Sequence, residues 1–190
     1  MHFYLLYMFE TKRLILRRFT ETKADLEAVF ALRSDAEMMR YIREPQNRAE
    51  SRNWLKLISS RWETEKIGFC AVIEKASKRI IGWCGLWRLL ETGETEIGYA
   101  IAKEFWGKGY ATEAAEKFLE YGFSELNLKK IVAVAREENT GSRRVMEKLG
   151  MEFDYIGEFY GRELVHYSIT REKFERDRRN KNLPLSTVEN

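Results

Sequence analysis

The sequence predicts a mixed α+β fold in which helices cover the faces of one central sheet. Apolar runs of strand length alternate with runs of helical spacing, in the order strand, two helices, three strands, helix, strand, helix and two strands. No linker rich in glycine or serine interrupts the 190 residues, and prolines occur only at Pro45 and Pro184. With 44% apolar and 33% charged residues, the chain has the composition of a globular protein that buries its own core. A single domain over residues 1–190 is therefore expected.

The N-terminal half is expected to contain a strand, two helices joined by a short helical turn, and a three-stranded meander. The first helix starts near Thr22, which stands three residues before Asp25 in the pattern of a weak capping box. The second helix follows Pro45 and carries Trp54 and Trp62 on its apolar stripe. The expected bounds are Arg13–Phe19, Thr22–Leu32, Asp35–Tyr41, Ala49–Glu63, Ile67–Glu74, Arg79–Leu89 and Glu94–Ala102.

The C-terminal half continues with helix, strand, helix and a final pair of strands around Gly161. The strand after the first of these helices is almost entirely apolar, as expected when both faces are buried. Gly150 is placed to end the next helix, and Arg171–Lys181, which mixes basic and acidic residues, is expected to be a solvated helix. The expected bounds are Ala111–Leu126, Lys130–Arg136, Ser142–Leu149, Met151–Phe159 and Glu163–Thr170. The first helix should bury Ala114, Ala115, Phe118, Leu119 and Phe123.

The N-terminal residues Met1–Phe9 are apolar and aromatic. They lack a basic region in front of them and are too short for a signal-peptide core or a membrane span. They are either a strand that leads into the sheet or extra residues upstream of a start at Met8. Since no targeting segment is visible, the cytoplasm is the expected compartment.

Charge and cysteine content argue against several classes of protein. The 33 basic and 30 acidic side chains give a net charge of +3, too balanced to indicate nucleic-acid binding by charge alone. RNA association remains a weak alternative. Cys70 and Cys84 form no CxxC pair, and the histidines are His2 and His166, so no metal site is expected and the thiols should be reduced.

The segment with the clearest chemistry joins the strand Glu94–Ala102 to a helix that starts near Tyr110. Gly107 and Gly109 let a phosphate approach the backbone, and Lys108 adds a positive charge. Unpaired N–H groups and the helix dipole favour negative charge at the helix start. The unit therefore predicts a pyrophosphate site. It is neither a P-loop nor a dinucleotide fingerprint, because the required residues do not follow the glycines.

Three blocks, in order, resemble the GNAT superfamily of N-acetyltransferases. Phe105–Ala114 resembles its acetyl-CoA motif, Gln/Arg-x-x-Gly-x-Gly/Ala, and Asn139–Glu152 resembles its later Asn-x-x-Ser/Ala helix. Thr11–Arg17 resembles the first strand of the subgroup that includes the ribosomal-protein acetyltransferases RimJ and RimL. The resemblance covers residues 11–172, with 173–190 as a basic C-terminal tail. It implies the GNAT fold, a mixed and mostly antiparallel twisted sheet of about six to seven strands flanked by about four helices and splayed at the acetyl-CoA cleft.

The same resemblance implies that acetyl-CoA is the cosubstrate and that no metal takes part. The cofactor should lie between the strands Glu94–Ala102 and Lys130–Arg136, with its pyrophosphate on the loop amides. Backbone N–H groups near Ile101 should polarise the thioester carbonyl. The candidate cofactor-binding residues are Ile101, Trp106, Gly107, Lys108, Gly109, Tyr110, Ala111, Thr112, Asn139 and Ser142.

Two positions depart from the family pattern. Trp106 stands where the acetyl-CoA motif has glutamine or arginine, which removes a polar donor but leaves the backbone N–H groups in place. Met146 stands where many relatives have a tyrosine that acts as general acid. An acid of that kind is therefore absent from this position.

Glu96 is the candidate general base, because an α-amine with a pKa near 8 is only about 10% neutral at pH 7. It shares a strand face with Gly98 and Ala100, which leaves room for a ligand beside the carboxylate. The alternative is a surface ion pair. By resemblance, Ser142 is the candidate to protonate or hydrogen-bond the CoA thiolate. The alternative for Ser142 is a helix cap near Asn139.

Trp83 and Trp87 share one face of their strand and are candidates to line the acceptor pocket. Core packing is the commoner role for such aromatic residues. The resemblance places Tyr160 and Tyr167 near the acceptor end. Cys70 and Cys84 lie on strands outside these motifs and are poor candidates for a nucleophile, so the amine is expected to attack the thioester directly.

The preferred acceptor is a protein or peptide N-terminal α-amine, from the RimJ/RimL resemblance. One alternative is a small amine, such as a polyamine, an amino acid or an aminoglycoside, and the cluster of Glu91, Glu94 and Glu96 suits a polyamine. Another is a CoA-binding regulatory protein that has lost catalysis. Neither a nucleic acid nor a membrane is expected as a direct partner, and the resemblance allows a homodimer.

Overall fold

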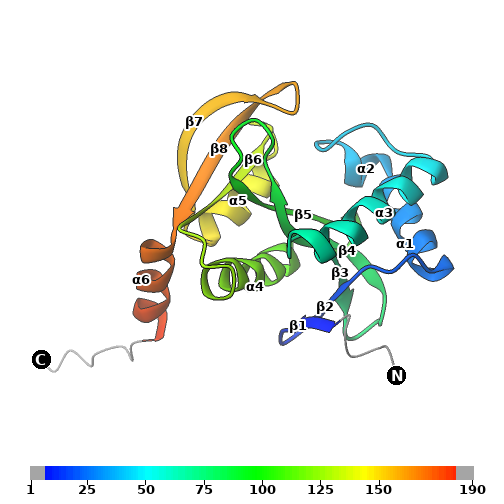
Figure 1. The fold of residues 1–190 in the computed structure, drawn as a ribbon, viewed down its shortest axis with the longest axis horizontal. Coiled ribbons are helices and arrows are strands. Elements are labelled where there is room, and N and C mark those ends of the chain that lie inside the picture. Colours follow the sequence, from blue (N-terminus) through cyan, green and yellow to red (C-terminus); the bar gives the residue numbers. More distant parts are fainter. Residues whose placement is uncertain (1–6, 183–190) are drawn as a thin grey trace, which may run out of the picture.

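Eight strands form one sheet in the computed structural model, which describes residues 7–182 (Figure 1). The strands are β1 (Tyr7–Glu10), β2 (Leu14–Arg18), β3 (Phe69–Glu74), β4 (Ile80–Arg88), β5 (Thr95–Ile101), β6 (Lys130–Ala135), β7 (Glu152–Phe159) and β8 (Arg162–Thr170). Their order across the sheet is β1-β2-β3-β4-β5-β6-β8-β7. Neighbouring strands are antiparallel, except that β5 and β6 run parallel.

Six α-helices accompany the sheet within the same residues. They are α1 (Lys23–Arg33), α2 (Ala36–Met39), α3 (Arg48–Thr64), α4 (Tyr110–Ser124), α5 (Thr140–Lys148) and α6 (Arg171–Asn182). In Figure 1, α1, α2 and α3 gather beside β3 and β4, while α4 and α5 lie near β5 and β6. None of the helices within residues 7–182 has the length and apolarity needed to cross a membrane.

Local sequence signals explain where several helices start. The side chain of Thr22 accepts a hydrogen bond from the Asp25 N–H and caps α1, as predicted. Asn47 and Glu50 form a complete capping box at the start of α3. In contrast, α4 starts after Gly109, and no side chain caps it. Its first N–H groups are therefore left for another partner.

The core has two main layers on opposite faces of the sheet. The layer under α4 contains all five of the residues predicted to face inward from that helix, and it includes alternate residues of β5, β6 and β8. These strand residues are Ile97, Ile101, Ile131, Ala133, Val165, Tyr167 and Ile169. The layer under α1, α2 and α3 contains Val29, Met39, Leu55, Trp83 and Ala100. Because side chains alternate along a strand, Glu96 points to this second face together with Ala100.

The two parallel strands, β5 and β6, pair over a much shorter length than their neighbours in the sheet. Within the described residues, β5 and β6 have a single pair of residues in register, Glu96 opposite Val132, whereas β4 and β5 pair from Gly82–Ile101 to Arg88–Thr95. Beyond Glu96 the two strands have no paired residues. Their carboxyl ends lead into the glycine loop and into α5, so both segments lie at the same edge of the sheet. Open α/β sheets bind ligands at such edges.

The count of elements differs from the expected six to seven strands and four helices. The additional strand is β1, which pairs with β2 and shows that the apolar N-terminal segment leads into the sheet from Tyr7. The four-residue α2 and the C-terminal α6 account for the additional helices. Residues 1–6, and the part of the predicted basic tail after residue 182, lie outside the described residues.

Candidate active site

The glycine loop ends in a helix start that can receive an anion. Gly107 and Gly109 have φ angles of +74° and +79°, in the region that favours glycine. A Cβ at Gly107 would meet no atom within 4 Å, so the backbone there is open to a ligand. The N–H groups of Tyr110, Ala111 and Thr112 form the first turn of α4, and no side chain caps this turn. The donors and the helix dipole fit a pyrophosphate.

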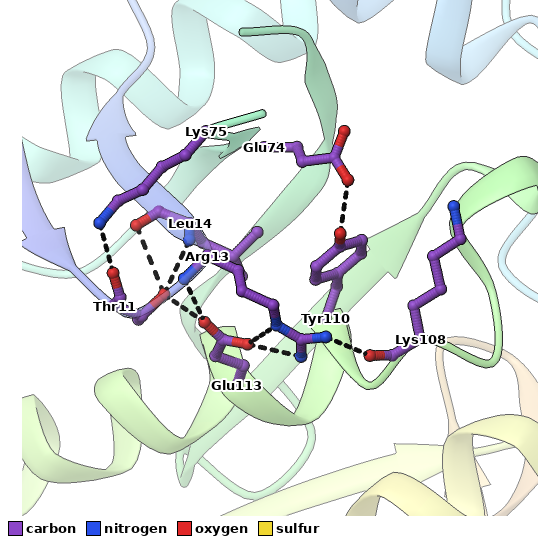
Figure 2. A network of polar contacts seen from close by, with 8 residues as sticks. All are labelled: Thr11, Arg13, Leu14, Glu74, Lys75, Lys108, Tyr110 and Glu113. Atoms are coloured by element: carbon purple, nitrogen blue, oxygen red, sulfur yellow. Dashed lines mark hydrogen bonds and ion pairs between the residues drawn. The ribbon is translucent and has the colours of Figure 1, made fainter. Parts of the chain in front are cut away.

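Arg13 and Glu113 hold this helix start against the first strands (Figure 2). Arg13 Nε donates to Glu113 Oε2 at 2.6 Å, and Arg13 Nη1 donates to the Lys108 carbonyl at 2.8 Å. Thr11 Oγ1 donates to the other carboxylate oxygen of Glu113 at 2.5 Å. Burial alone would raise the pKa of Glu113, but the hydrogen bonds from Thr11 and Arg13 outweigh it and lower that pKa. The loop therefore has a rigid, ionised support.

The side chain of Tyr110 belongs to that support. Its hydroxyl donates to Glu74 Oε1, its ring is buried, and the Arg13 guanidinium lies 4.6 Å from the ring centroid. Figure 2 shows Tyr110 turned towards Glu74. Of the groups on Tyr110, only the backbone N–H is therefore placed to bind a cofactor.

Trp106 precedes Gly107, Lys108 lies between Gly107 and Gly109, and both side chains retain exposed surface. Trp106 Nε1 donates to the carbonyl of Ile101 at 2.5 Å, and 46% of Trp106 is exposed. Lys108 Nζ lies 4.9 Å from the centroid of the Phe105 ring. The N–H of Ala102 bonds to Ile81 of β4, and successive N–H groups of a strand alternate in direction. The Ile101 N–H therefore points to the side where β5 and β6 separate.

The second block places Asn139 and Ser142 at the start of α5. Asn139 caps the helix, because its Oδ1 accepts from the Ser142 N–H at 3.1 Å. Ser142 is in the first turn, so the cap is Asn139. The Tyr99 hydroxyl of β5 lies 3.0 Å from the Ser142 carbonyl and 3.2 Å from Ser142 Oγ. This contact joins α5 to β5 across the separated strands.

Glu96 is a buried carboxyl with few partners. It is 9% exposed, and its Oε2 accepts from the Tyr160 hydroxyl at 2.7 Å. Burial raises the pKa of Glu96 to about 7, while hydrogen bonds from Tyr160 and the Val134 backbone limit the rise. The Tyr160 N–H donates to Glu91 at 2.5 Å, which fixes the turn between β7 and β8 beside the turn before β5. Perturbed carboxyls of this kind concentrate at functional sites.

The predicted site residues divide between the two faces of the sheet. Glu96 and Tyr160 meet on the face of α1, α2 and α3, whereas Tyr99 and Ser142 meet on the face of α4 and α5. Tyr167 is buried under α4, and Arg143 Nε lies 3.3 Å from its hydroxyl, so Tyr167 is on the opposite face of the sheet from Tyr160. A ligand bound between β5 and β6 would have the Glu96–Tyr160 pair on one side and the Tyr99–Ser142 pair on the other.

The two tryptophans of β4 have different surroundings. Trp83 is 4% exposed and packs against Trp54 at a centroid distance of 5.4 Å, as a core residue does. Trp87 stands opposite Glu96 in the register and stacks on Phe69 at 5.3 Å. Trp87 keeps partial exposure on the face of Glu96. No group of three or more His, Cys, Asp or Glu within residues 7–182 is arranged to hold a metal ion.

Comparison with known proteins identifies the family. The family model described as acetyltransferase (GNAT) domain matches residues 13–152. The chain belongs to the GNAT family. It is therefore an acetyl-CoA-dependent N-acetyltransferase with the GNAT fold. YnaD, an uncharacterized N-acetyltransferase of Bacillus subtilis, is 38% identical to this GNAT enzyme over 141 residues, which cover 74% of this chain and 80% of YnaD.

Solved structures share the GNAT fold. A GNAT-family acetyltransferase from Bacillus anthracis aligns with a TM-score of 0.72 and 29% identity, over 86% of this chain and 98% of that chain. The ribosomal-protein-S5-alanine acetyltransferase of Vibrio fischeri aligns at 0.73 with 17% identity, over 87% and 97%. The aminoglycoside acetyltransferase AAC(6')-Ib, in complex with coenzyme A, aligns at 0.74 with 20% identity, over 87% and 99%. At these last two identities the likeness shows the fold alone.

Three residues that shape the site, Arg13, Tyr99 and Glu113, could not be predicted from the sequence. Arg13 and Glu113 are paired across 100 residues of sequence, and Tyr99 meets Ser142 across 43. No spacing pattern links residues so far apart. The sequence indicated only which face of β5 carries Tyr99. Ile97, Tyr99 and Ile101 occupy every second position of the strand and therefore share one face.

The ionisation of Glu96 should make stability depend on pH. The folded pKa of about 7 lies above the ordinary 4.5, so the stabilising contribution is complete below pH 4.5 and is lost as pH rises to about 7. The loss is on the order of 3 kcal/mol. Glu96→Gln should therefore melt several degrees above wild type at pH 8, and the gap should close near pH 4.5. Thermal unfolding of both proteins between pH 4.5 and pH 8 measures this difference in melting temperature.

Glu94→Gln is the matched control for stability. Burial alone would raise the pKa of Glu94, but its partner Lys130, 2.5 Å away, outweighs burial and lowers that pKa. This variant should lose stability above pH 5, the opposite sign. If Glu96→Gln is less stable than wild type at every pH, the buried carboxylate is a stabilising ion and this account of Glu96 fails.

Proposed function

We propose that this GNAT enzyme acetylates the N-terminal α-amine of a protein or peptide, as in the RimJ/RimL-like subgroup. The observation that carries the proposal is the buried carboxyl of Glu96, with a pKa of about 7 and a hydrogen bond from Tyr160. An α-amine with a pKa near 8 is close enough to this value for efficient proton transfer at neutral pH. A lysine amine, with a pKa near 10.4, is far less often neutral.

Acetyl-CoA supplies the acetyl group as an activated thioester. The backbone N–H groups of residues 107–112 hold its pyrophosphate, with Lys108 as an additional cation. The Trp106 N–H is not among these donors, because it donates to the Lys103 carbonyl at 3.0 Å. The Ile101 N–H, directed to the separated side of β5, donates to the thioester carbonyl. Open backbone at Gly107 and the uncapped start of α4 support this assignment.

Glu96 takes one proton from the acceptor amine as the new C–N bond forms and the C–S bond breaks. The sulfur leaves as the CoA thiolate on the face of Ser142, opposite Glu96, and takes up a proton from solvent. Ser142 donates a hydrogen bond to the departing sulfur, and its hydroxyl is oriented by Tyr99. Burial raises the pKa of Tyr99, so this phenol remains a protonated donor. Asn139 contributes by fixing the first turn of α5.

The choice of an α-amine acceptor is supported by two considerations. The ribosomal-protein-S5-alanine acetyltransferase of Vibrio fischeri is built on the same fold, so the fold is compatible with a protein acceptor. A polyamine would need free acidic side chains, but Glu94 is ion-paired with Lys130 and Glu91 accepts from the Tyr160 N–H. The remaining acid, Glu96, is needed as the base. Trp87 and Tyr160 are the proposed walls of the acceptor site, with Trp83 behind Trp87.

Localising the acetyl group tests the proposal. A peptide with a free α-amine and one internal lysine is incubated with enzyme and acetyl-CoA, and fragment masses locate the modification. We expect acetylation at the α-amine and none on a matched peptide whose α-amine is blocked. Acetylation of the lysine in both peptides would contradict an α-amine acceptor.

Removing the Tyr160 hydroxyl should shift the pH dependence of turnover. The hydrogen bond from Tyr160 favours ionised Glu96, so its loss in Tyr160→Phe raises the pKa of Glu96 above about 7. Because the base acts only when ionised, the rising limb of kcat against pH should move up by about one to two pH units. Tyr155→Phe, an exposed residue of β7, is the control and should leave the limb in place. An unchanged limb in Tyr160→Phe would mean that Glu96 is not the titrating base.

A further inference from the structure

Arg33, at the end of α1, is a buried guanidinium without a carboxylate partner among the described residues. It is 2% exposed, and its Nε donates to Gln46 Oε1 at 2.6 Å. Its charged group lies 4.2 Å from the ring centroid of Trp54 and 5.3 Å from that of Trp83. Arginine is seldom buried to this degree unless it is paired with an acid. The two indole faces compensate part of the charge and leave the rest as positive potential.

In the part of the chain that the structure describes, Arg33 has one positive and one negative charged neighbour, Arg43 and Glu50. Burial lowers the pKa of Arg33 to about 9, the charge of Arg43 lowers it further, and Glu50 opposes both. Arg43 is exposed in the segment between α2 and α3. Glu50, which accepts from the Asn47 N–H in the capping box of α3, is one negative charge against the two guanidinium groups of Arg33 and Arg43. The balance around Arg33 is therefore positive.

The segment that carries Arg43 connects Arg33 to the proposed acceptor site. The Gln46 N–H donates to the Arg33 carbonyl at 2.7 Å, which ties one end of the segment to α1. At the other end, Arg162 Nη1 donates to the Ile42 carbonyl at 3.0 Å. Arg162 is two residues beyond Tyr160 in the sequence. Arg43 therefore lies in a segment that is held at one end to Arg33 and at the other end to Arg162, beside the turn that carries Tyr160.

We propose that this region, defined by Arg33, Arg43 and Arg162, binds a carboxylate of the acceptor. Arg43 makes the direct contact, and Arg33 supplies the buried charge behind it. The inference rests on the proposed function and narrows it to α-amines of peptides with an acidic side chain near the N-terminus. Charge-assisted bonds between guanidinium and carboxylate are among the strongest polar contacts available to a protein.

The distance between the level of Glu96 and that of the carboxylate site favours a peptide over a free amino acid as the acceptor. Trp83 stands opposite Ala100, and Trp87 stands opposite Glu96. The two levels are four residue steps apart along β4, about 13 Å, and the buried charge of Arg33 lies at the level of Trp83. The carboxylate of a free amino acid is two bonds from its nitrogen and cannot span this distance. An extended peptide advances about 3.4 Å per residue, so a glutamate at the third position can reach it.

The test compares two hexapeptides that differ only in glutamate or glutamine at position three, both with a free α-amine. Wild type should show a kcat/KM about tenfold higher for the glutamate peptide at low salt, and added salt should reduce the preference. Arg43→Gln, at an exposed position, should bring the ratio close to one. Arg52→Gln removes the same charge from an exposed position on α3 and should keep the wild-type ratio.

Arg33→Met provides the second variant, with thermal melting as a check of folding. If it folds, it should also lower the preference for glutamate. Equal rates for the two peptides in wild type, or equal ratios in Arg43→Gln and Arg52→Gln, would overturn the carboxylate site while the proposed function stands. Absence of turnover with either peptide, alongside turnover of another amine class, would overturn the proposed function and this inference together.

Discussion

Replacing Glu96 with glutamine should lower kcat for the α-amine acceptor by about 10²–10⁴-fold near pH 7.5, the range that general base catalysis contributes. The amide keeps the size of the side chain and can still accept from the Tyr160 hydroxyl, but it cannot take a proton. Because the site around Glu96 is buried, with Glu96 itself only 9% exposed, few other bases can reach an amine bound beside it. The affinity for acetyl-CoA should be unchanged, because the cofactor loop lies beyond the other end of β5.

Glu94→Gln is the control for this loss of turnover. Glu94 is two residues from Glu96, and it pairs with Lys130 at 2.5 Å instead of facing the Tyr160 hydroxyl. Its replacement should change kcat by no more than a few-fold. Equal activities for the two variants would show that Glu96 has a structural role only. Steady-state CoA release with one peptide acceptor is sufficient for the comparison.

Replacing Gly109 with valine should weaken CoA binding by about 30- to 100-fold. Gly109 has a φ of +79°, and a β-branched residue in this conformation costs roughly 1–2 kcal/mol. A Cβ would also lie 3.5 Å from Arg13 Nη2, which holds the loop. Relief of the strain turns the N–H groups of Tyr110 and Ala111 away from the pyrophosphate, and each charge-assisted bond contributes about 1.5–3 kcal/mol.

Gly93→Val separates loss of binding from general strain. Gly93 has a comparable φ of +71°, and a Cβ there would meet nothing within 4 Å. Both variants should be destabilised to a similar extent, but only Gly109→Val should lose CoA affinity in titration calorimetry. Equal affinities in the two variants would remove the loop from the cofactor site.

Local patterns in the sequence predicted much of the fold. The apolar spacing of α4, the near-continuous apolar run of β6 and the cap that Thr22 provides for α1 each depend on residues within a few positions of one another. The glycine loop was also predictable, because its function depends on backbone freedom and on the start of α4. These features need no knowledge of how distant segments meet.

The arrangement of the site depends on long-range contacts that no local pattern contains. Tyr160 reaches Glu96 across 64 residues, and its position depends on a turn in which Tyr160 has a φ of +54°. The same limit applies to Tyr167, for which the resemblance suggested the acceptor side although alternation along β8 places it under α4. The faces of strands become predictable only when the neighbouring strands are known.

The pKa of Glu96 illustrates why the sequence alone left two interpretations open. A glutamate on a strand is a surface residue unless the elements around it exclude water. Here the turn before β5 and the turn between β7 and β8 meet through Glu91 and Tyr160, and they cover the carboxyl. Burial then raises its pKa to about 7. The chemistry of this residue therefore follows from tertiary packing of two hairpins.

The most direct test of the account is CoA release from acetyl-CoA across a matched panel of amines. The panel contains peptides with free α-amines, polyamines, free amino acids and aminoglycosides, each at the same concentration near neutral pH. We expect the highest kcat/KM for the peptides, and little release with polyamines or free amino acids. Faster release with any of the small amines than with every peptide, or binding of acetyl-CoA without release for any amine, would contradict an enzyme that acetylates peptide α-amines.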